Sequence, residues 1–192
     1  MARAPSPGFT LLELMIAVAI IVLLAALAAP SLSDFFDRNR VRAAADDVSS
    51  LISHARAEAV KNDVPVRITM TGSGTAWCVG ANAATPPTGG AKAGNALACD
   101  CTQTTQCMVA GIRQVVTSAD YREVAIGALP GDIRFDNTLG AIVGTDGTMG
   151  QRTVTLTSPS GKYDVVVEVE TLGQARSCTP STRPRLSGLP QC

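Results

Sequence analysis

The feature that most constrains this chain is an apolar run near its start. Residues 9–29 contain one charged side chain, that of Glu13, in a stretch of mostly aliphatic residues. A helix of about 20 apolar residues spans the hydrocarbon core of a bilayer. We therefore expect residues 9–29 to span a membrane, with Glu13 near one end, where a carboxylate reaches the headgroups at modest cost.

A secretory signal peptide is the main alternative for this run. Such a peptide has a basic start and an apolar core of about 7 to 15 residues. Here Arg3 is the only basic side chain before a longer run, although Ala-Leu-Ala-Ala at residues 26–29 resembles a cleavage site. The sequence favours a span that is retained in the mature protein.

The start of the run has the pattern of a known leader. "GFTLLELMIAVAII", beginning at Gly8, resembles the class III leader of type IV prepilins and type II secretion pseudopilins. The resemblance implies a leader peptide of residues 1–8, cleavage by prepilin peptidase between Gly8 and Phe9, and methylation of the new Phe9 amine. It also implies that Glu13 serves assembly by neutralising the Phe9 amine of a neighbouring pilin. Such a pair is tolerable in low dielectric, where each charge alone is costly.

The helical pattern continues beyond the apolar run. Apolar residues recur at spacings of three and four, at Val41, Ala44, Val48, Leu51, Ile52, Ala55 and Ala59. This spacing predicts one helix from Phe9 to about Lys61, with a transmembrane half at 9–29 and an amphipathic half at 30–61. Pro30 should kink this helix, and residues 62–65 should end it.

Residues 62–192 have the pattern of a β-rich domain. Alternating apolar residues, separated by turn-forming residues, predict antiparallel strands. The expected strands are 64–70, 75–79, 109–116, 121–126, 132–135, 140–143, 151–157 and 163–170, with a long cysteine-containing loop at 80–107 and a basic tail at 171–192. The predicted fold is α+β, with a long N-terminal helix packed on an antiparallel sheet domain.

Four further segments resemble the GspH/FimT family of minor pilins and pseudopilins. They are "LISHARAEAVKNDVPVRI" (51–68), "IRF" (133–135), "GTDGT" (144–148) and "VEVETLGQARSC" (167–178). The resemblance implies a pilin-like fold and other major and minor pilins as partners. It also implies a single pass through the bacterial inner membrane with the C-terminal domain in the periplasm, and later a place in the pilus. Arg38, Arg40 and Arg42 oppose this orientation under the positive-inside rule, whereas the leader and the cysteines favour it.

Six cysteines in an exported chain indicate disulfides and an oxidising compartment. Cys178 and Cys192 stand apart and are expected to pair, which would close a tail loop worth roughly 3 kcal/mol. The second set, Cys78, Cys99, Cys101 and Cys107, can pair as 78 with 99 and 101 with 107, or as 78 with 101 and 99 with 107. A zinc site in "CDCTQTTQC" is less favoured, because structural zinc prefers regular Cys-x2–4-Cys spacing.

The sequence gives little support to catalysis. His54 is the only histidine, and no nucleophile elbow accompanies it. Asp46 with Asp47, and Glu168 with Glu170, are more simply solvated surfaces. We expect a non-enzymatic protein without a metal or other cofactor.

The tail suggests a second hypothesis, binding of double-stranded DNA. After Glu170 the chain carries Arg176, Arg183 and Arg185 and no acidic side chain, and Lys162 lies shortly before. The guanidinium group of arginine donates two parallel hydrogen bonds to phosphate oxygens, and such contacts bind DNA independently of its sequence. Some FimT members bind DNA in natural transformation through a Gly-Arg-x-Arg motif; here the matching residues are Gly173, Gln174, Ala175 and Arg176, so the first arginine is replaced.

These patterns together predict a minor type IV pilin, a structural subunit at or near the pilus tip that supports assembly. Two alternatives stay open. One is a minor pseudopilin of a type II secretion system, which shares the leader and the fold. The other is a dedicated DNA-binding competence pilin that uses the arginine-rich tail.

Overall fold

The computed structural model describes residues 8–84, 96–127, 131–144 and 149–192, and for residues 28–30 it describes the backbone alone. The chain divides into two compact units, Met1–Phe36 and Asp37–Cys192. The expected leader, residues 1–8, lies outside the described residues except for Gly8. The helix α1 (Leu11–Lys61) contributes to both units.

No single helix in the described part of the chain has the length and hydropathy of a membrane span. The segments Leu11–Leu27 and Ser31–Lys61 meet that criterion together, as a pair bent by 43°. The break lies at the residues around Pro30, where the sequence predicts a kink.

In the second unit, α1 buries the predicted apolar stripe. Its fully or almost fully buried residues are Val41, Ala44, Ala45, Val48, Leu51, Ile52, Ala55 and Ala59. The helix ends in a Schellman motif, because Val64 N–H donates to the Ala59 carbonyl, Asp63 N–H donates to the Val60 carbonyl, and Asp63 has a positive φ of 52°. The predicted end at residues 62–65 is therefore confirmed, with an aspartate in the position that glycine usually takes.

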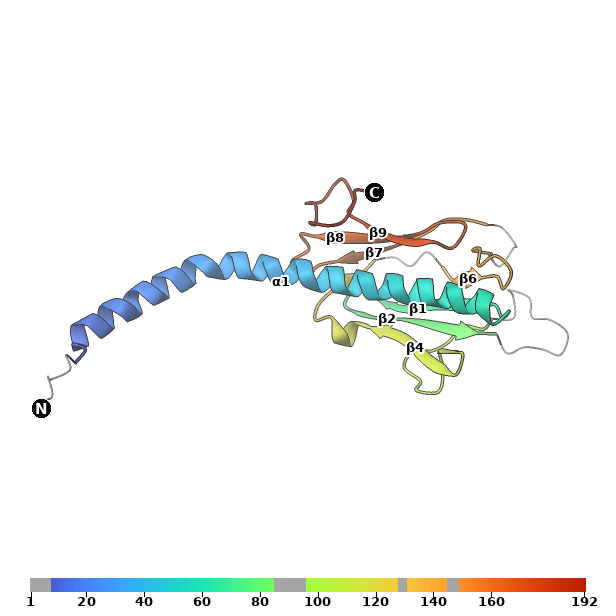
Figure 1. The fold of residues 1–192 in the computed structure, drawn as a ribbon, viewed down its shortest axis with the longest axis horizontal. Coiled ribbons are helices and arrows are strands. Elements are labelled where there is room, and N and C mark those ends of the chain that lie inside the picture. Colours follow the sequence, from blue (N-terminus) through green and yellow to red (C-terminus); the bar gives the residue numbers. More distant parts are fainter. Residues whose placement is uncertain (1–7, 85–95, 128–130, 145–148) are drawn as a thin grey trace, which may run out of the picture. The chain divides into compact units, whose positions relative to one another are not determined.

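In the described part of this unit, nine strands form two antiparallel sheets. Figure 1 draws the strands as arrows. The first sheet has the order β3-β4-β2-β1-β6, and the second has the order β5-β7-β8-β9. The strands are β1 (Val66–Ser73), β2 (Ala76–Ala83), β3 (Met108–Val109), β4 (Ile112–Thr117), β5 (Ala125–Ile126), β6 (Ile133–Phe135), β7 (Arg152–Thr157), β8 (Asp164–Val169) and β9 (Ala175–Cys178). A 3-10 turn, η2 (Ser118–Asp120), follows β4.

One core joins these elements. The stripe of α1 is buried together with inward-facing residues of both sheets, among them Ile68, Phe135, Leu156 and Val167. The α+β fold, with a long N-terminal helix and an antiparallel β domain, is confirmed.

Three predicted strands are wrong in detail. The expected strand 109–116 is a hairpin, since Ala110 and Gly111 adopt positive φ values of 51° and 79° and turn the chain between β3 and β4. Only Ala125–Ile126 of the expected strand 121–126 pairs, with β7. The expected strand 140–143 supplies a single bridge, from Ile142 to Phe135.

Two other boundaries also need correction. The loop expected at 80–107 begins too early, because β2 continues to Ala83 in register with Val66. The basic tail expected from residue 171 contains β9, which pairs with β8. In both cases the neighbouring strand extends the pairing through residues whose own side chains give no strong strand pattern.

Candidate functional site

The N-terminus of α1 begins with a capping box formed by Thr10 and Glu13. The Thr10 N–H donates to Glu13 Oε2 at 3.1 Å, and the Glu13 N–H donates to Thr10 Oγ1 at 3.2 Å. The Thr10 hydroxyl also donates to the same carboxylate at 3.0 Å. These bonds satisfy amide groups that lack a helical partner. Glu13 therefore has a local structural role that the sequence reasoning missed, although Thr-x-x-Glu before an apolar run is its usual signature.

The first unit presents an unpacked apolar helix. Every described residue from Gly8 to Leu27 is exposed, and Phe9 is 86% exposed. Apart from its two chain neighbours, no described residue has an atom within 4 Å of a Cβ built on Gly8. In water such a surface is strongly unfavourable. Its coverage has to come from lipid or from other chains.

The C-terminal tail is packed against the domain. Leu186 and Leu189 are buried in the main core. Cys178 forms a disulfide with Cys192, and the adjacent Thr179 pairs with Gln191. This disulfide is the one expected from the sequence.

The tail also contacts α1 through an arginine. Arg42 of α1 donates from Nη1 to the carbonyl of Ser187 at 2.9 Å, and its Nε lies 3.7 Å from the Asp46 carboxylate. Arg38, one turn earlier, lies over the Tyr163 ring at 4.9 Å. Two of the three arginines that oppose the expected orientation therefore make contacts within the domain.

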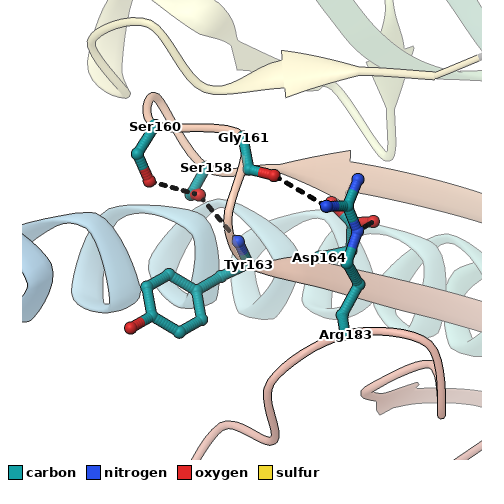
Figure 2. Close-up of polar contacts among 6 residues, drawn as sticks. All are labelled: Ser158, Ser160, Gly161, Tyr163, Asp164 and Arg183. Atoms are coloured by element: carbon teal, nitrogen blue, oxygen red, sulfur yellow. Dashed lines mark hydrogen bonds and ion pairs between the residues drawn. The ribbon is translucent and has the colours of Figure 1, made fainter.

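Arg176 and Arg183, two of the candidate DNA-binding arginines, are occupied by carboxylates. Arg176 lies directly across from Glu168 on β8 and β9, with nitrogen–oxygen distances of 2.8 Å to Glu168 and 3.6 Å to Glu170. Arg183 donates from Nε to Asp164 at 2.8 Å and from Nη1 to the Gly161 carbonyl at 2.9 Å (Figure 2). Each of these two arginines is therefore already paired with an acidic side chain of the domain.

The other two candidates differ from these. Arg185 donates to the Leu189 carbonyl at 3.4 Å, and it has no carboxylate partner among the described residues. Lys162 Nζ lies 5.4 Å from the centre of the Tyr163 ring. In the same turn between β7 and β8, the Ser158 hydroxyl accepts a hydrogen bond from the Tyr163 N–H at 3.0 Å and stabilises the turn (Figure 2).

The second cysteine set forms two disulfides on the outer face of the first sheet. Cys78 pairs with Cys101, and Cys99 pairs with Cys107. This is the second of the two pairings that the sequence left open. The sulfurs of Cys99 and Cys107 lie over Gly80, where an added Cβ would be 2.5 Å from Cys107 Sγ. Glycine at position 80 is therefore part of this disulfide cluster.

One group of possible metal ligands is brought together in the described chain. Glu168, Cys178 and Cys192 place a carboxylate and two sulfurs within 4.8 Å of one another. The two sulfurs are bonded to each other and offer no thiolate. The group is therefore a disulfide next to the Arg176–Glu168 ion pair, and its sulfurs are not metal ligands.

A groove of about 410 Å³ lies between α1 and β4. Asp47 and His54 of α1 line it together with Tyr121, whose hydroxyl donates to the Asp47 carboxylate. Burial, followed by the bond to Asp47, raises the pKa of Tyr121. The Tyr121 ring stacks on Trp77 at 6.2 Å between centroids. These contacts join α1 to the first sheet.

His54 belongs to a network on the surface of α1. Its Nε2 lies 4.0 Å from Glu58 Oε1, and Glu58 also accepts from Lys61 at 3.2 Å and from Asn62 at 2.6 Å. The bond from Lys61, and then that from Asn62, lowers the pKa of the Glu58 carboxyl. This network supports the last turns of the helix.

Comparison with known proteins bears on both units. The model of a family described as "Type II transport protein GspH" matches residues 44–173, which is more than half of the chain. The chain belongs to the GspH family. A second model, the prokaryotic N-terminal methylation motif, matches residues 4–29 of this GspH-family protein.

One solved structure resembles the GspH-family chain. It is the crystal structure of the type IV minor pilin FimU of Pseudomonas aeruginosa, with 15% sequence identity and a TM-score of 0.46. The match covers 80% of this chain and 97% of that one. No curated protein has a significant sequence match.

Family membership makes this chain a pilin-like or pseudopilin-like subunit, in agreement with the resemblance found in the sequence.

The sequence reasoning does not predict which carboxylates pair with the tail arginines, namely Asp164, Glu168 and Glu170. The pattern of "VEVETLGQARSC" could have indicated a hairpin, with Gly173 in its turn at a positive φ of 78°. That hairpin places Glu168 opposite Arg176.

Proposed function

We propose that this GspH-family protein is a minor structural subunit of a type IV pilus, located at or near its tip. The observation that carries the proposal is the exposed apolar segment from Phe9 to Leu27, which lies within the residues matched by the methylation motif and precedes a well-packed β domain. Before assembly the inner membrane covers this helix, with the β domain in the periplasm. After assembly the helices of other major and minor pilins cover it.

Processing and assembly use the first residues of the helix. Prepilin peptidase removes residues 1–8, and the new amine of Phe9 is methylated. Glu13 then neutralises the Phe9 amine of a neighbouring subunit, since both charges are costly in an apolar bundle unless paired. Exposure of both residues in the isolated chain supports this role.

A test of the proposal uses a substitution at the cleavage position. Gly8→Val is expected to prevent removal of the leader, because it places a branched side chain at the bond that prepilin peptidase cuts. The described residues leave room for that side chain, so the fold of the chain should not change. Mass spectrometry would show the unprocessed mass in place of a chain beginning at Phe9 with one added methyl group. Pili sheared from the cells should then lack the protein. Normal processing and incorporation of the Gly8→Val variant would contradict the proposal.

A pseudopilin of a type II secretion system is the second candidate. The family match supports it equally, because the family takes its description from that system. The "GQARSC" tail, through its resemblance to FimT, leads us to favour the pilus. Deletion of the gene, followed by measurement of surface pili and of secreted protein in the same strain, separates the two candidates.

DNA binding through Arg176, Arg183, Arg185 and Lys162 stays a prediction with reduced support. Binding of a DNA phosphate to Arg176 or Arg183 would have to displace a carboxylate at 2.8 Å. A mobility-shift assay of the full chain in detergent, with and without the three arginines changed to glutamine, tests it. Loss of a salt-sensitive shift in the variant would support DNA binding.

A further inference from the structure

Two arginines lie side by side on the outer face of the first sheet. Arg67 of β1 is directly opposite Arg134 of β6 in the antiparallel register. Their strand neighbours, among them Ile68 and Ile133, are buried in the main core, so both arginines project from the opposite face. The pairing register therefore fixes two guanidinium groups next to each other.

The positive charge of this pair is only partly compensated. Asp132, the residue before β6, forms an ion pair with Arg67. Arg134 has no ion pair or side-chain hydrogen bond among the described residues. Like charges directly opposite each other destabilise a strand pair. Two cations and one anion thus leave a local charge of plus one.

The guanidinium groups also hold unused hydrogen-bond donors. The Nε atoms of Arg67 and Arg134 are both buried, and neither has an acceptor among the described residues. The Arg67 side chain is 17% exposed. A buried donor without an acceptor costs free energy, and native proteins satisfy nearly all such groups.

The neighbouring strand does not supply the missing acceptor. Asn82 of β2 lies opposite Arg67 on its other side. The amide oxygen of Asn82 already accepts from the Met108 N–H at 3.2 Å, and its nitrogen donates to the Leu97 carbonyl at 3.4 Å. Asn82 is therefore engaged with the residues that follow β2.

We propose that Arg67 and Arg134 form a binding site for an oxyanion, either a phosphate or a carboxylate. Such a group offers two or more acceptor oxygens, which match the planar fork of a guanidinium. It would compensate the unpaired charge and accept from the buried donors. The source is a free phosphate ion or a carboxylate side chain of a neighbouring subunit. This inference does not depend on the tail arginines.

The test uses the full chain in detergent micelles, labelled with nitrogen-15 and observed at its arginine Nε–H resonances. Sodium phosphate and sodium acetate are added separately, at an ionic strength held constant with chloride. We expect the Arg67 and Arg134 resonances to shift and saturate. In Arg134→Gln the affinity for the bound anion should fall about tenfold, the effect of losing one charge-assisted contact.

Arg122→Gln is the matched control, because Arg122 is an exposed arginine outside both sheets. Its affinity should equal that of the unchanged protein. Saturation with phosphate alone indicates a phosphate site, and similar saturation with acetate indicates a site for a protein carboxylate. An unchanged protein that binds neither anion would overturn the proposal, as would equal affinity in Arg134→Gln.

Discussion

Arg183 connects the C-terminal tail to the first residue of β8 through the carboxylate of Asp164. The Arg183 Nε lies 2.8 Å from Asp164 Oδ2, and the Asp164 side chain is 12% exposed whereas that of Arg183 is 41% exposed. The second Asp164 oxygen is buried and has no hydrogen-bond partner in the described part of the chain. A carboxylate in this position depends on its arginine, so the pair has a structural role in the domain.

Replacement of Arg183 by glutamine should destabilise the domain by about 1.5–3 kcal/mol, as for other hydrogen bonds to charged groups. Urea unfolding followed by the fluorescence of Trp77, the only tryptophan, measures the loss. In a double-mutant cycle with Asp164→Asn the two losses should not add. Additive losses would show that the two residues act independently.

Thr10 and Glu13 share the capping box, so their variants separate capping from assembly. Thr10→Ala removes the threonine hydroxyl and should weaken the helix start by about 0.5–2 kcal/mol. Glu13→Gln removes the charge that we assign to assembly. We expect pili sheared from cells to contain the Thr10→Ala protein and to lack the Glu13→Gln protein. Equal loss of both proteins would mean that capping alone explains the need for Glu13.

Gly80→Ala should interfere with the disulfide cluster. The added Cβ would lie 2.5 Å from Cys107 Sγ and 3.1 Å from Cys99 Sγ. Overpacking of this kind typically costs about 1–3 kcal/mol. The control is the same substitution in a chain with Cys99→Ala and Cys107→Ala, where the loss measured by urea unfolding should be smaller. The same loss in both backgrounds would contradict the steric explanation.

Tyr121 should make the protein sensitive to alkali. Its pKa in the folded protein is raised above the usual value of 10, by burial and then by the bond to Asp47. A raised folded-state pKa gives stability that is complete below pH 10 and is lost as the pH rises toward the folded-state value. Tyr121→Phe should therefore lose less stability above pH 10 than the unchanged protein. Tyr163→Phe, which changes the other tyrosine, is the control. If Tyr121→Phe lost as much stability above pH 10 as the unchanged protein, Tyr121 would not be the group responsible.

Local patterns in the sequence predict much of this fold. The spacing of Val41, Ala44, Val48 and Ile52 identifies the buried side of α1, because a helix brings residues three and four apart to one face. The end at residues 62–65 is also local, since it needs only Asp63 in a left-handed conformation. Such features depend on a few neighbouring residues.

Features that depend on pairing were predicted less well. Apolar residues lie on both sides of Ala110 and Gly111, so the sequence pattern predicts one strand where the structure has a hairpin. The tail arginines appear uncompensated in the sequence, since Asp164 precedes Arg183 by 19 positions and meets it only after the tail folds back. Arg38 and Arg42 likewise count as free charges in the positive-inside rule, although both have partners in the domain.

Three kinds of interaction hold the C-terminal tail, and each responds to a different change in the surroundings. Reductants act on the Cys178–Cys192 disulfide, and acid or high salt acts on the Arg183–Asp164 ion pair. The buried side chains of Leu186 and Leu189 are indifferent to both. No single one of these changes therefore releases the tail.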